Sequence, residues 1–201
     1  MSATDAPADA AEAQTVTATA YEALLLGGRS GSGKTSVATE VSLILAAGGV
    51  AHCHIEGDYL AEVHPAPPGD PDRGVLTAAN LAAVWRNNAA AGYRRLVYTN
   101  TVSVVGHEWI ATALGAPTTF TRVLLTAGDD TVAERLGRRE TGSGLAVHLE
   151  RSHRRSTWLE QNADDGVVRV PTDGRSLPDI AAEVAGLTGW LTAPPPGAQP
   201  A

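Results

Sequence analysis

The chain has 201 residues, of which 43% are hydrophobic, enough to build the core of one globular domain. Acidic residues outnumber basic ones by 22 to 15, and the resulting net charge of −7 argues against a nucleic-acid or membrane-surface binder. A single cysteine excludes a disulfide framework. Because the sequence lacks a secretory signal and an apolar run of roughly 18–20 residues, we expect a cytoplasmic protein.

Residues 1–20 and 193–201 contain few large apolar side chains, so we predict a disordered arm and a disordered tail around a domain at 21–192. Within that domain, apolar segments of strand length alternate with segments of helical periodicity. The strands are expected at residues 23–26, 50–55, 96–98, 120–125 and 167–170. The helices are expected from residue 34, at 76–91, 107–114, 131–139 and 146–161, and after Ser176. Such alternation predicts an α/β fold with a mostly parallel sheet and helices on both faces.

The segment between the first strand and the first helix reads GRSGSGKT and matches the phosphate-binding pattern G-x-x-x-x-G-K-[ST]. Glycines let the backbone turn tightly and aim its N–H groups at phosphate oxygens, and the following helix adds its positive end. Lys34, the only lysine in the chain, would hold the β- and γ-phosphates, and the Thr35 hydroxyl would bind Mg²⁺. A chance glycine-rich turn is the alternative, but the flanking strand and helix favour a nucleotide site. The predicted nucleotide-binding residues are Gly28, Arg29, Ser30, Gly31, Ser32, Gly33, Lys34, Thr35 and Ser36.

Two classes of P-loop protein fit this sequence poorly. A GTPase needs a D-x-x-G switch, which is absent, and an N-K-x-D base reader, which is impossible because Lys34 is already used. A motor-like ATPase usually has an acid at the end of the third strand, where this chain has Asn100. The second strand, in contrast, leads to Asp58 at the edge of the sheet where ligands bind. A carboxylate there can accept the proton of an acceptor hydroxyl; the alternative is a solvated turn residue.

These motifs resemble those of the small P-loop kinases of the adenylate kinase-like group, among them gluconate kinase, shikimate kinase and adenylylsulfate kinase, over about residues 21–190. The resemblance implies a three-layer P-loop NTPase fold whose five-stranded parallel sheet has the order 2-3-1-4-5. It also implies ATP and Mg²⁺ as cofactors and a small-molecule acceptor. Lys34 and Asp58 are then catalytic, with Asp58 as the acceptor-side base or Mg²⁺ organiser.

A small mobile lid, at about residues 137–155, is a further feature that the resemblance implies. Arg135 and Arg139 lie near its start, and their four-residue spacing puts them on one helical face. We therefore predict that these two close over the phosphates, because a guanidinium suits the charge of a transferring phosphoryl group. Other arginines of this region, several of which are expected to be surface cations, are Arg151, Arg154 and Arg155.

The acceptor side has partial matches to gluconate kinase in the segments GDYLAEVHP and GDPDRG. Arg73 could pair with an anionic group of the substrate, and Asn100 could hydrogen-bond a polyol or a water; a surface turn and a strand cap are the alternatives. The loop after the fifth strand contains Asp173 and Gly174 and resembles the loop that packs against adenine in these kinases. Asp173 could equally be a turn residue.

The favoured hypothesis is an ATP-dependent kinase that transfers the γ-phosphoryl group of ATP to a hydroxyl of a small acceptor. We expect a monomer or a homodimer that binds neither nucleic acid nor membrane. The alternative is an ATP-binding regulatory or resistance protein with little or no turnover. Formation of ADP in response to an acceptor would distinguish the two.

Overall fold

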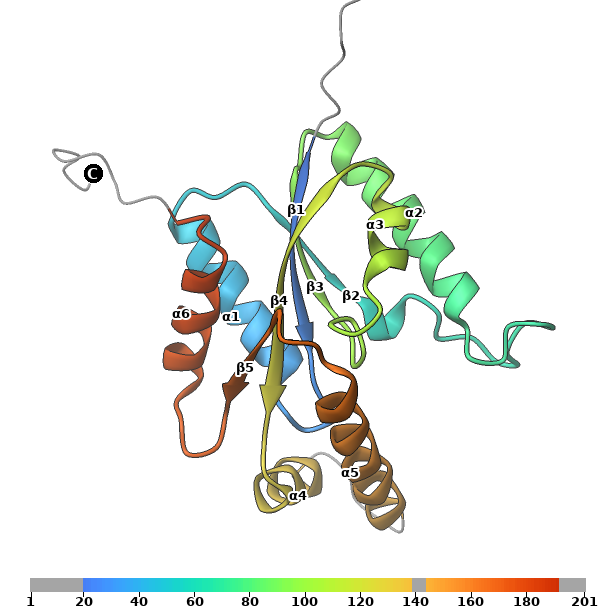
Figure 1. Ribbon diagram of the computed structural model, residues 1–201, viewed down its shortest axis with the longest axis vertical. Helices are drawn as coiled ribbons and strands as arrows, with labels where there is room; N and C mark the ends of the chain where they lie inside the picture. The colour runs from blue at the N-terminus through green and yellow to red at the C-terminus, as the bar shows by residue number, and fades with distance from the viewer. Residues whose placement is uncertain (1–19, 139–143, 192–201) are drawn as a thin grey trace, which may run out of the picture.

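The structure is a computed structural model that describes residues 20–138 and 144–191 (Figure 1). The predicted arm up to residue 19, the predicted tail and Arg139 therefore lie outside the described residues. Within the described ranges, no helix combines the length and the apolar character needed to cross a bilayer. The elements in chain order are β1 (Tyr21–Gly27), α1 (Lys34–Ala47), β2 (Cys53–Glu56), the 3₁₀ turn η1 (Gly57–Tyr59), α2 (Gly74–Ala90), β3 (Arg95–Thr99), α3 (Glu108–Leu114), β4 (Thr118–Thr126), α4 (Asp129–Gly137), α5 (Leu145–Asn162), β5 (Val167–Pro171) and α6 (Leu177–Leu187).

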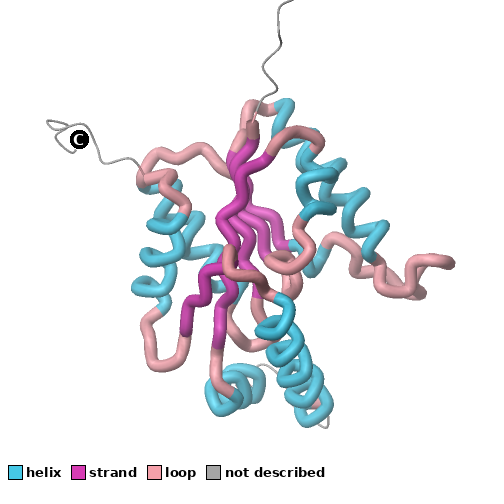
Figure 2. The backbone as a smooth tube through the Cα atoms, in the orientation of Figure 1, coloured by secondary structure: helices cyan, strands magenta, loops and turns pink. Residues whose placement is uncertain are grey.

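The five strands form one parallel sheet in the order β2-β3-β1-β4-β5, which confirms the order that the resemblance implied. β1 is central, and its Leu26 lies opposite Thr99 of β3 and Val123 of β4. The strands form the magenta layer of Figure 2, with helices on both sides. Because all strands run in the same direction, the segments that follow β1, β2 and β3 meet at one edge of the sheet.

Alternate side chains of β1 enter two separate cores. Leu24 and Leu26 are buried against α1 and α6. Ala23 and Leu25 face the opposite way and are buried against α2 and α3. Because both faces of the strand are covered, its sequence is an unbroken apolar run, which is typical of parallel sheets. A third, smaller apolar cluster joins α4 to α5.

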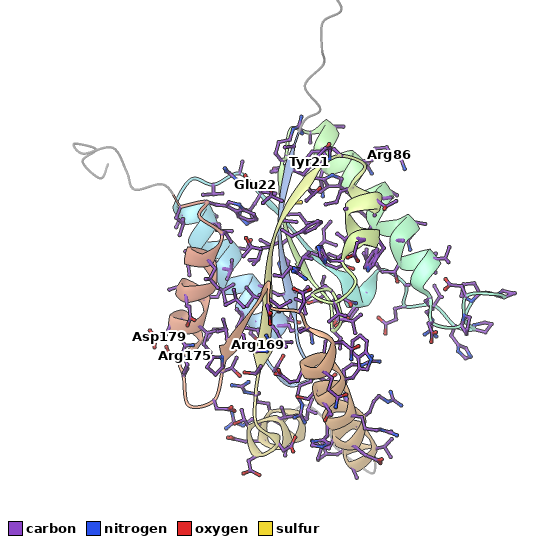
Figure 3. All side chains as sticks on the ribbon, viewed as in Figure 1. Tyr21, Glu22, Arg86, Arg169, Arg175 and Asp179 are labelled. Carbon is purple, nitrogen blue, oxygen red and sulfur yellow. The ribbon has the colours of Figure 1, made fainter. Side chains whose placement is uncertain are left out.

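The amino ends of the strands are joined by polar contacts. Glu22 of β1 accepts hydrogen bonds from Arg95 Nε and from Trp190 Nε1, each at 2.9 Å. Figure 3 shows Tyr21 and Glu22 at the end of the sheet remote from α4 and α5. These contacts join β1 to β3 and to the segment after α6, at the end of the sheet opposite its carboxyl edge.

The second strand is shorter than the sequence predicts, because β2 begins at Cys53 and not at Val50. Val50 donates its N–H to the carbonyl oxygen of Leu45 at the end of α1 (2.9 Å), and the His52 ring lies 2.6 Å from Ser42 Oγ. These contacts hold residues 50–52 to α1, so the pairing with β3 starts only at Cys53.

The turn η1 follows β2 directly, and the periodicity of the sequence does not reveal it. Gly57 begins this turn and is buried against Tyr98, which is itself fully buried. A Cβ atom at position 57 would overlap the Tyr98 ring and would lie 2.7 Å from the carbonyl oxygen of Thr99. The absence of a side chain therefore allows β2 to pass close to β3 at the point where Asp58 leaves the sheet.

We predict that Gly57→Ala destabilises the domain by about 1–3 kcal/mol, because the added methyl group must displace a packed ring or the β3 backbone. Gly74→Ala is the matched control, since a Cβ at this first residue of α2 meets no atom within 4 Å. Urea denaturation of both variants measures the two free energies of unfolding. Equal stability of the two variants would show that the Tyr98 contact does not constrain position 57.

Candidate active site

Glycines determine the path of the P-loop, the segment of residues 28–35 between β1 and α1. Gly28, Gly31 and Gly33 have φ angles of +146°, +85° and +98°, a region that favours glycine. A Cβ on Gly28 would lie 2.6 Å from Ser32 Oγ and 2.7 Å from the carbonyl oxygen of Leu125. The compact curve of this loop therefore requires glycine both for its backbone angles and for its close packing.

Lys34 is the first residue of α1 and is only 8% exposed. Its Nζ lies 3.4 Å from the carbonyl oxygen of Arg29, so the side chain folds back over the P-loop. Gly33, the N-cap of this helix, has no side chain to cap the first turn, whose backbone N–H groups point toward the P-loop. An ammonium and a helix N-terminus thus face the same small volume, which suits an anion.

A cavity of about 220 Å³, here called the phosphate cavity, joins the P-loop to the turn after β2. Lys34 and Asp58 both line it, so the structure brings together the cation and the carboxylate that the sequence predicted on the two sides of one site. The lining residues are Ser30, Gly31, Gly33, Lys34, Thr35, Asp58, Leu136 and His148.

Glu56, to which sequence reasoning assigned no role, is a central residue of this site. Its Oε2 accepts a hydrogen bond from Thr35 Oγ1 (2.8 Å), and its Oε1 accepts one from Thr99 Oγ1 (2.5 Å). The sequence does contain a signal for this residue, namely the Glu56-Gly57-Asp58 spacing. Two acidic residues that are two positions apart at the end of a strand lie at the same edge of the sheet. A hydroxyl beside a carboxylate is a set of hard oxygen donors, and Mg²⁺ in nucleotide sites needs few protein ligands besides phosphate oxygens. The predicted Mg²⁺ ligand Thr35 therefore lies where such an ion would fit.

The Asp58 carboxylate is held by the residues that follow β3. Asn100 Nδ2 donates to Oδ1 at 2.8 Å, and the Thr101 N–H donates to the same atom at 3.4 Å. Surrounding protein atoms withdraw solvent and raise the pKa of Asp58; the charge of Lys34 opposes this shift, and that of Glu56 adds to it. A carboxyl group with a raised pKa beside a cationic loop has the properties of a general base. Asn100, predicted to contact the acceptor, orients this carboxylate.

Arg135 lies against the P-loop backbone. Its Nη1 donates to the carbonyl oxygens of Gly31 and Ser32, both at 3.2 Å, and to Thr172 Oγ1 at 3.0 Å. Its Nη2 donates to the carbonyl oxygen of Thr172 at 3.2 Å. These bonds tie the P-loop to the segment after β5. Arg139, predicted to act with Arg135, lies outside the described residues.

A further cavity, of about 250 Å³, lies between the P-loop, the segment after β5 and α6. Leu177 and Ile180 supply apolar surface, and Ser36, Thr172 and Arg175 supply polar groups. Arg175 donates a hydrogen bond to Glu183 Oε2 of α6 at 2.6 Å, and Figure 3 labels it near the start of that helix. A cavity of mixed polarity next to a phosphate-binding loop suits the base and sugar of a nucleotide.

Asp173 and Gly174, predicted to bind the nucleotide, do not line this further cavity. Both carboxylate oxygens of Asp173 accept the N–H of Gly128 at 3.0 Å, which fixes the residue before α4. A hydrogen bond from the Thr131 side chain lowers the pKa of Asp173. Gly174 has φ of +65° and completes the turn. In this structure the Asp173 carboxylate therefore connects the loop after β5 to the start of α4.

Arg73 lines none of these cavities. It is the N-cap of α2, with φ of +58°. The loop between η1 and α2 projects away from the sheet and from the P-loop (Figure 1).

Of the predicted lid at 137–155, residues from Leu145 onward belong to the regular helix α5.

Arg29, at the second position of the P-loop, is 4% exposed and connects the P-loop to two helices. Its Nη1 lies 2.6 Å from Asp129 Oδ1 at the start of α4, and its Nε donates to Ser152 Oγ of α5 at 2.9 Å. Ser152 Oγ in turn donates to the carbonyl oxygen of Ser30 at 2.9 Å. The sequence pattern allows any residue at this position, so only the structure reveals that Arg29 anchors the P-loop.

No protein-family model and no curated protein matches this sequence. Among solved structures, the tunicamycin resistance protein of Deinococcus radiodurans is similar with a TM-score of 0.59 and 22% identity, covering 87% of this chain and 99% of that one. A gluconokinase from Sinorhizobium meliloti 1021 gives 0.55 and 20%, covering 84% and 91%. Shikimate kinase from Acinetobacter baumannii, in complex with shikimate, gives 0.52 and 14%, covering 84% and 93%. The chain has the fold of the small P-loop kinases.

We predict that Asp129→Ala lowers the free energy of unfolding by about 1–3 kcal/mol at neutral pH, because it leaves the nearly buried Arg29 guanidinium without its carboxylate. Asp130→Ala is the matched control, since it removes an exposed acid from the same first turn of α4. Urea denaturation compares the two variants. A loss that is equal in both would reflect the helix terminus and not the contact with Arg29.

The difference in free energy of unfolding between Asp129→Ala and Asp130→Ala should depend on pH. Hydrogen bonds from Arg29 and then from His153 lower the pKa of Asp129. A carboxylate with a lowered pKa stabilises the fold above the pKa of the unfolded chain, and this contribution is lost as the pH falls through the folded value. The difference in free energy of unfolding between the two variants should therefore become smaller below about pH 4. A gap that widens there would contradict the pairing.

Proposed function

We propose that this protein is an ATP-dependent phosphotransferase that transfers the γ-phosphoryl group of ATP to a hydroxyl of a small acceptor. The observation that carries the proposal is the phosphate cavity, which has Lys34 and the P-loop on one side and Asp58 on the other. The raised pKa of Asp58 supports the proposal, because a base must be able to hold a proton during the reaction.

In the proposed reaction, Asp58 accepts the proton of the acceptor hydroxyl while that oxygen attacks the γ-phosphorus. The new bond joins the acceptor oxygen to phosphorus, the bond from phosphorus to the β,γ-bridging oxygen breaks, and ADP leaves with that electron pair. Lys34 and the α1 N-terminus stabilise the charge on the phosphates. Asn100 keeps Asp58 in place through its 2.8 Å hydrogen bond.

Thr35 and Glu56, whose side chains are hydrogen-bonded to each other at 2.8 Å, are the residues that would hold Mg²⁺. When bound, the ion would neutralise phosphate charge and orient the transferred group. Thr35 of the P-loop donates to one oxygen of Glu56, and Thr99 of β3 donates to the other. These two hydrogen bonds together fix the orientation of the carboxylate.

The second candidate is an ATP-binding resistance protein with little or no turnover. The likeness to the tunicamycin resistance protein favours a resistance role, whereas the likeness to the gluconokinase and the shikimate kinase favours a small-molecule acceptor. ADP formation with a panel of polyols, hydroxy acids and antibiotics distinguishes the candidates. Stimulation by an acceptor supports the kinase, and tight ATP binding with no stimulation supports the second candidate.

We predict that Asp58→Asn lowers kcat by about 10²–10⁴-fold, because the amide cannot accept the proton, while the affinity for an ATP analogue changes little. The variant should be at least as stable as the parent protein at neutral pH, since a carboxyl with a raised pKa is disfavoured in its charged form in the folded state. Initial rates, calorimetric binding and thermal unfolding measure the three quantities.

Asp72→Asn, which changes an exposed acid of the loop before α2, controls for the loss of one negative charge. Its turnover should match that of the parent protein. Unchanged kcat in Asp58→Asn would remove this carboxylate from the mechanism. Loss of analogue binding would show that Asp58 serves the nucleotide and not the acceptor.

We further predict that the acid limb of the kcat/KM profile lies above the pH at which an ordinary aspartate titrates, about 3.9, because Asp58 must be deprotonated to act and its pKa is raised. Glu56→Gln removes a negative charge that contributes to this shift, so the limb should move to lower pH. Profiles at saturating Mg²⁺ separate this effect from metal binding. A limb that stays in place or moves upward would contradict the assignment.

A further inference from the structure

The segment that follows β3 carries the two groups that hold the proposed base. Asn100 Nδ2 and the Thr101 N–H donate to the same oxygen of Asp58, at 2.8 and 3.4 Å. These two residues begin a segment, residues 100–107 and here called the β3 loop, that belongs to no strand or helix. Contacts with other parts of the protein must therefore determine the path of the β3 loop, and with it the position of the carboxylate.

An arginine of β4 reaches the second half of the β3 loop. Arg122 Nη1 donates to the carbonyl oxygen of Val104 at 3.3 Å and lies 3.5 Å from Nδ1 of His107. The Arg122 side chain is only 13% exposed, so this charge-assisted hydrogen bond is largely shielded from water. The His107 ring in turn packs edge-on against Phe120 of β4, with the ring centres 4.9 Å apart. Strand β4 thus holds the β3 loop at two residues.

The turn between α5 and β5 holds the other side of the same guanidinium. Nη1 and Nη2 of Arg122 donate to the two carboxylate oxygens of Asp164, at 2.7 and 2.8 Å. Only a guanidinium offers such a pair of donors in a rigid plane. These hydrogen bonds, and then one from the Gly166 N–H, lower the pKa of Asp164 to about 2, so the carboxylate is charged at neutral pH. The Arg122 guanidinium therefore has a defined position beside the β3 loop.

Close packing fills the space between this guanidinium and the P-loop. Val104 is fully buried, and a Cβ on Gly27, the last residue of β1, would lie 2.8 Å from Val104 Cγ2. The Ser103 hydroxyl donates to the carbonyl oxygen of Asn100 at 3.0 Å, and the Val102 N–H donates to Asn100 Oδ1 at 3.1 Å. Residues 100–104 are thus one compact turn, so a displacement of Val104 also displaces Asn100.

We propose that Arg122 is a positioning residue for the reaction, which holds the β3 loop so that Asn100 and Thr101 keep Asp58 in the phosphate cavity. This inference rests on the proposed function and adds to its machinery a residue that lines neither the phosphate cavity nor the cavity beside α6. Arg122 acts at a distance because a shift of about 1 Å in a catalytic group can cost about 10²-fold in rate.

The first test compares the kinetics of Arg122→Met with those of Arg169→Met. Arg169 of β5 is the matched control, because it donates to the carbonyl oxygen of Ala163 in the same turn at 3.1 Å and pairs with Glu160 at 2.9 Å. None of its hydrogen bonds among the described residues reaches the β3 loop. We expect Arg122→Met to lower kcat by about tenfold or more and to leave the KM of ATP within about threefold. The control should leave both values within about twofold.

A double-mutant cycle with Asn100→Ala shows whether Arg122 acts through the β3 loop. The Asn100→Ala variant has already lost one hydrogen bond to Asp58. Arg122→Met should therefore lower kcat by less than about threefold in that background, against about tenfold in the parent protein. Equal factors in the two backgrounds would contradict the proposal.

Gly166→Ala displaces the guanidinium while keeping every charge. A Cβ at position 166 would lie 2.5 Å from Arg122 Nη2, the mobile end of a long side chain, so the fold should tolerate this substitution if Arg122→Met does not fold. We expect kcat to fall as in Arg122→Met, by a smaller factor. Gly186→Ala is the matched control, because a Cβ there meets no atom within 4 Å. A loss in Arg122→Met that Gly166→Ala does not share would assign the effect to charge and not to position.

A measurement that needs no acceptor separates this inference from the proposed function. The ¹³C shift of the Asp58 carboxyl carbon, assigned by its absence from Asp58→Asn, reports the pKa of Asp58 as the pH is varied. The hydrogen bond from the Thr101 N–H lowers this pKa, so the pKa should rise in Arg122→Met and stay unchanged in Arg169→Met. Lys34 and Glu56, the charged groups that act on Asp58, are present in each of these variants.

Three further outcomes would overturn the inference. The first is an Asp58 pKa that is equal in the parent protein and in Arg122→Met. The second is a rise in the KM of ATP as large as the fall in kcat, which would assign Arg122 to the P-loop. The third is a fall in kcat that Arg169→Met shares, which would reflect a general loss of stability. If no acceptor supports turnover, the proposed function fails, and the pKa measurement still decides whether Arg122 positions Asp58.

Discussion

Hydrogen bonds that join the end of β1 and the start of the P-loop to the residues that follow β3 are the contacts on which the whole site depends. The N–H of Gly28 donates to the carbonyl oxygen of Thr101, and the N–H of Asn100 donates to that of Leu26, both at 3.2 Å. The parallel ladder thus continues past the strands and into the P-loop. Because Asn100 also holds Asp58, the phosphate-binding loop and the proposed base have positions set by the same two segments.

A second set of contacts holds the P-loop from its other side. Arg29 connects it to α4 and α5, and Arg135 connects it to the segment after β5. A loop with three glycines at positive φ has many accessible conformations when unfolded, and ordering it is costly. The two arginines offset part of that cost with buried or half-buried charge-assisted hydrogen bonds. The pre-formed shape of the P-loop is therefore a property of the surrounding elements as much as of its own sequence.

The regular elements and the P-loop could be predicted because their signals are local. The apolar run of β1 and the glycine spacing after it are legible without knowledge of any distant residue. Glu56 received no role from the sequence, and Arg29 was predicted only as one residue of the nucleotide-binding loop. Their hydrogen-bond partners, Thr35 and Asp129, are close to them only in the folded chain. β2 was predicted too long for a related reason: its first expected residues are held by α1.

The contacts of Arg135 likewise depend on residues that are distant in the sequence. Helical spacing groups Arg135 with Arg139, but the sheet order places β5 beside β4, so the segment after β5 lies within reach of Arg135. Spacing on α5 has a different consequence, because this one helix carries both the buried Ser152 and the exposed arginines next to it. Ser152 accepts a hydrogen bond from Arg29 and donates one to the Ser30 carbonyl oxygen, so it joins α5 to the P-loop at two points. The position of α5 and the path of the P-loop therefore depend on one buried hydroxyl group that bonds to both.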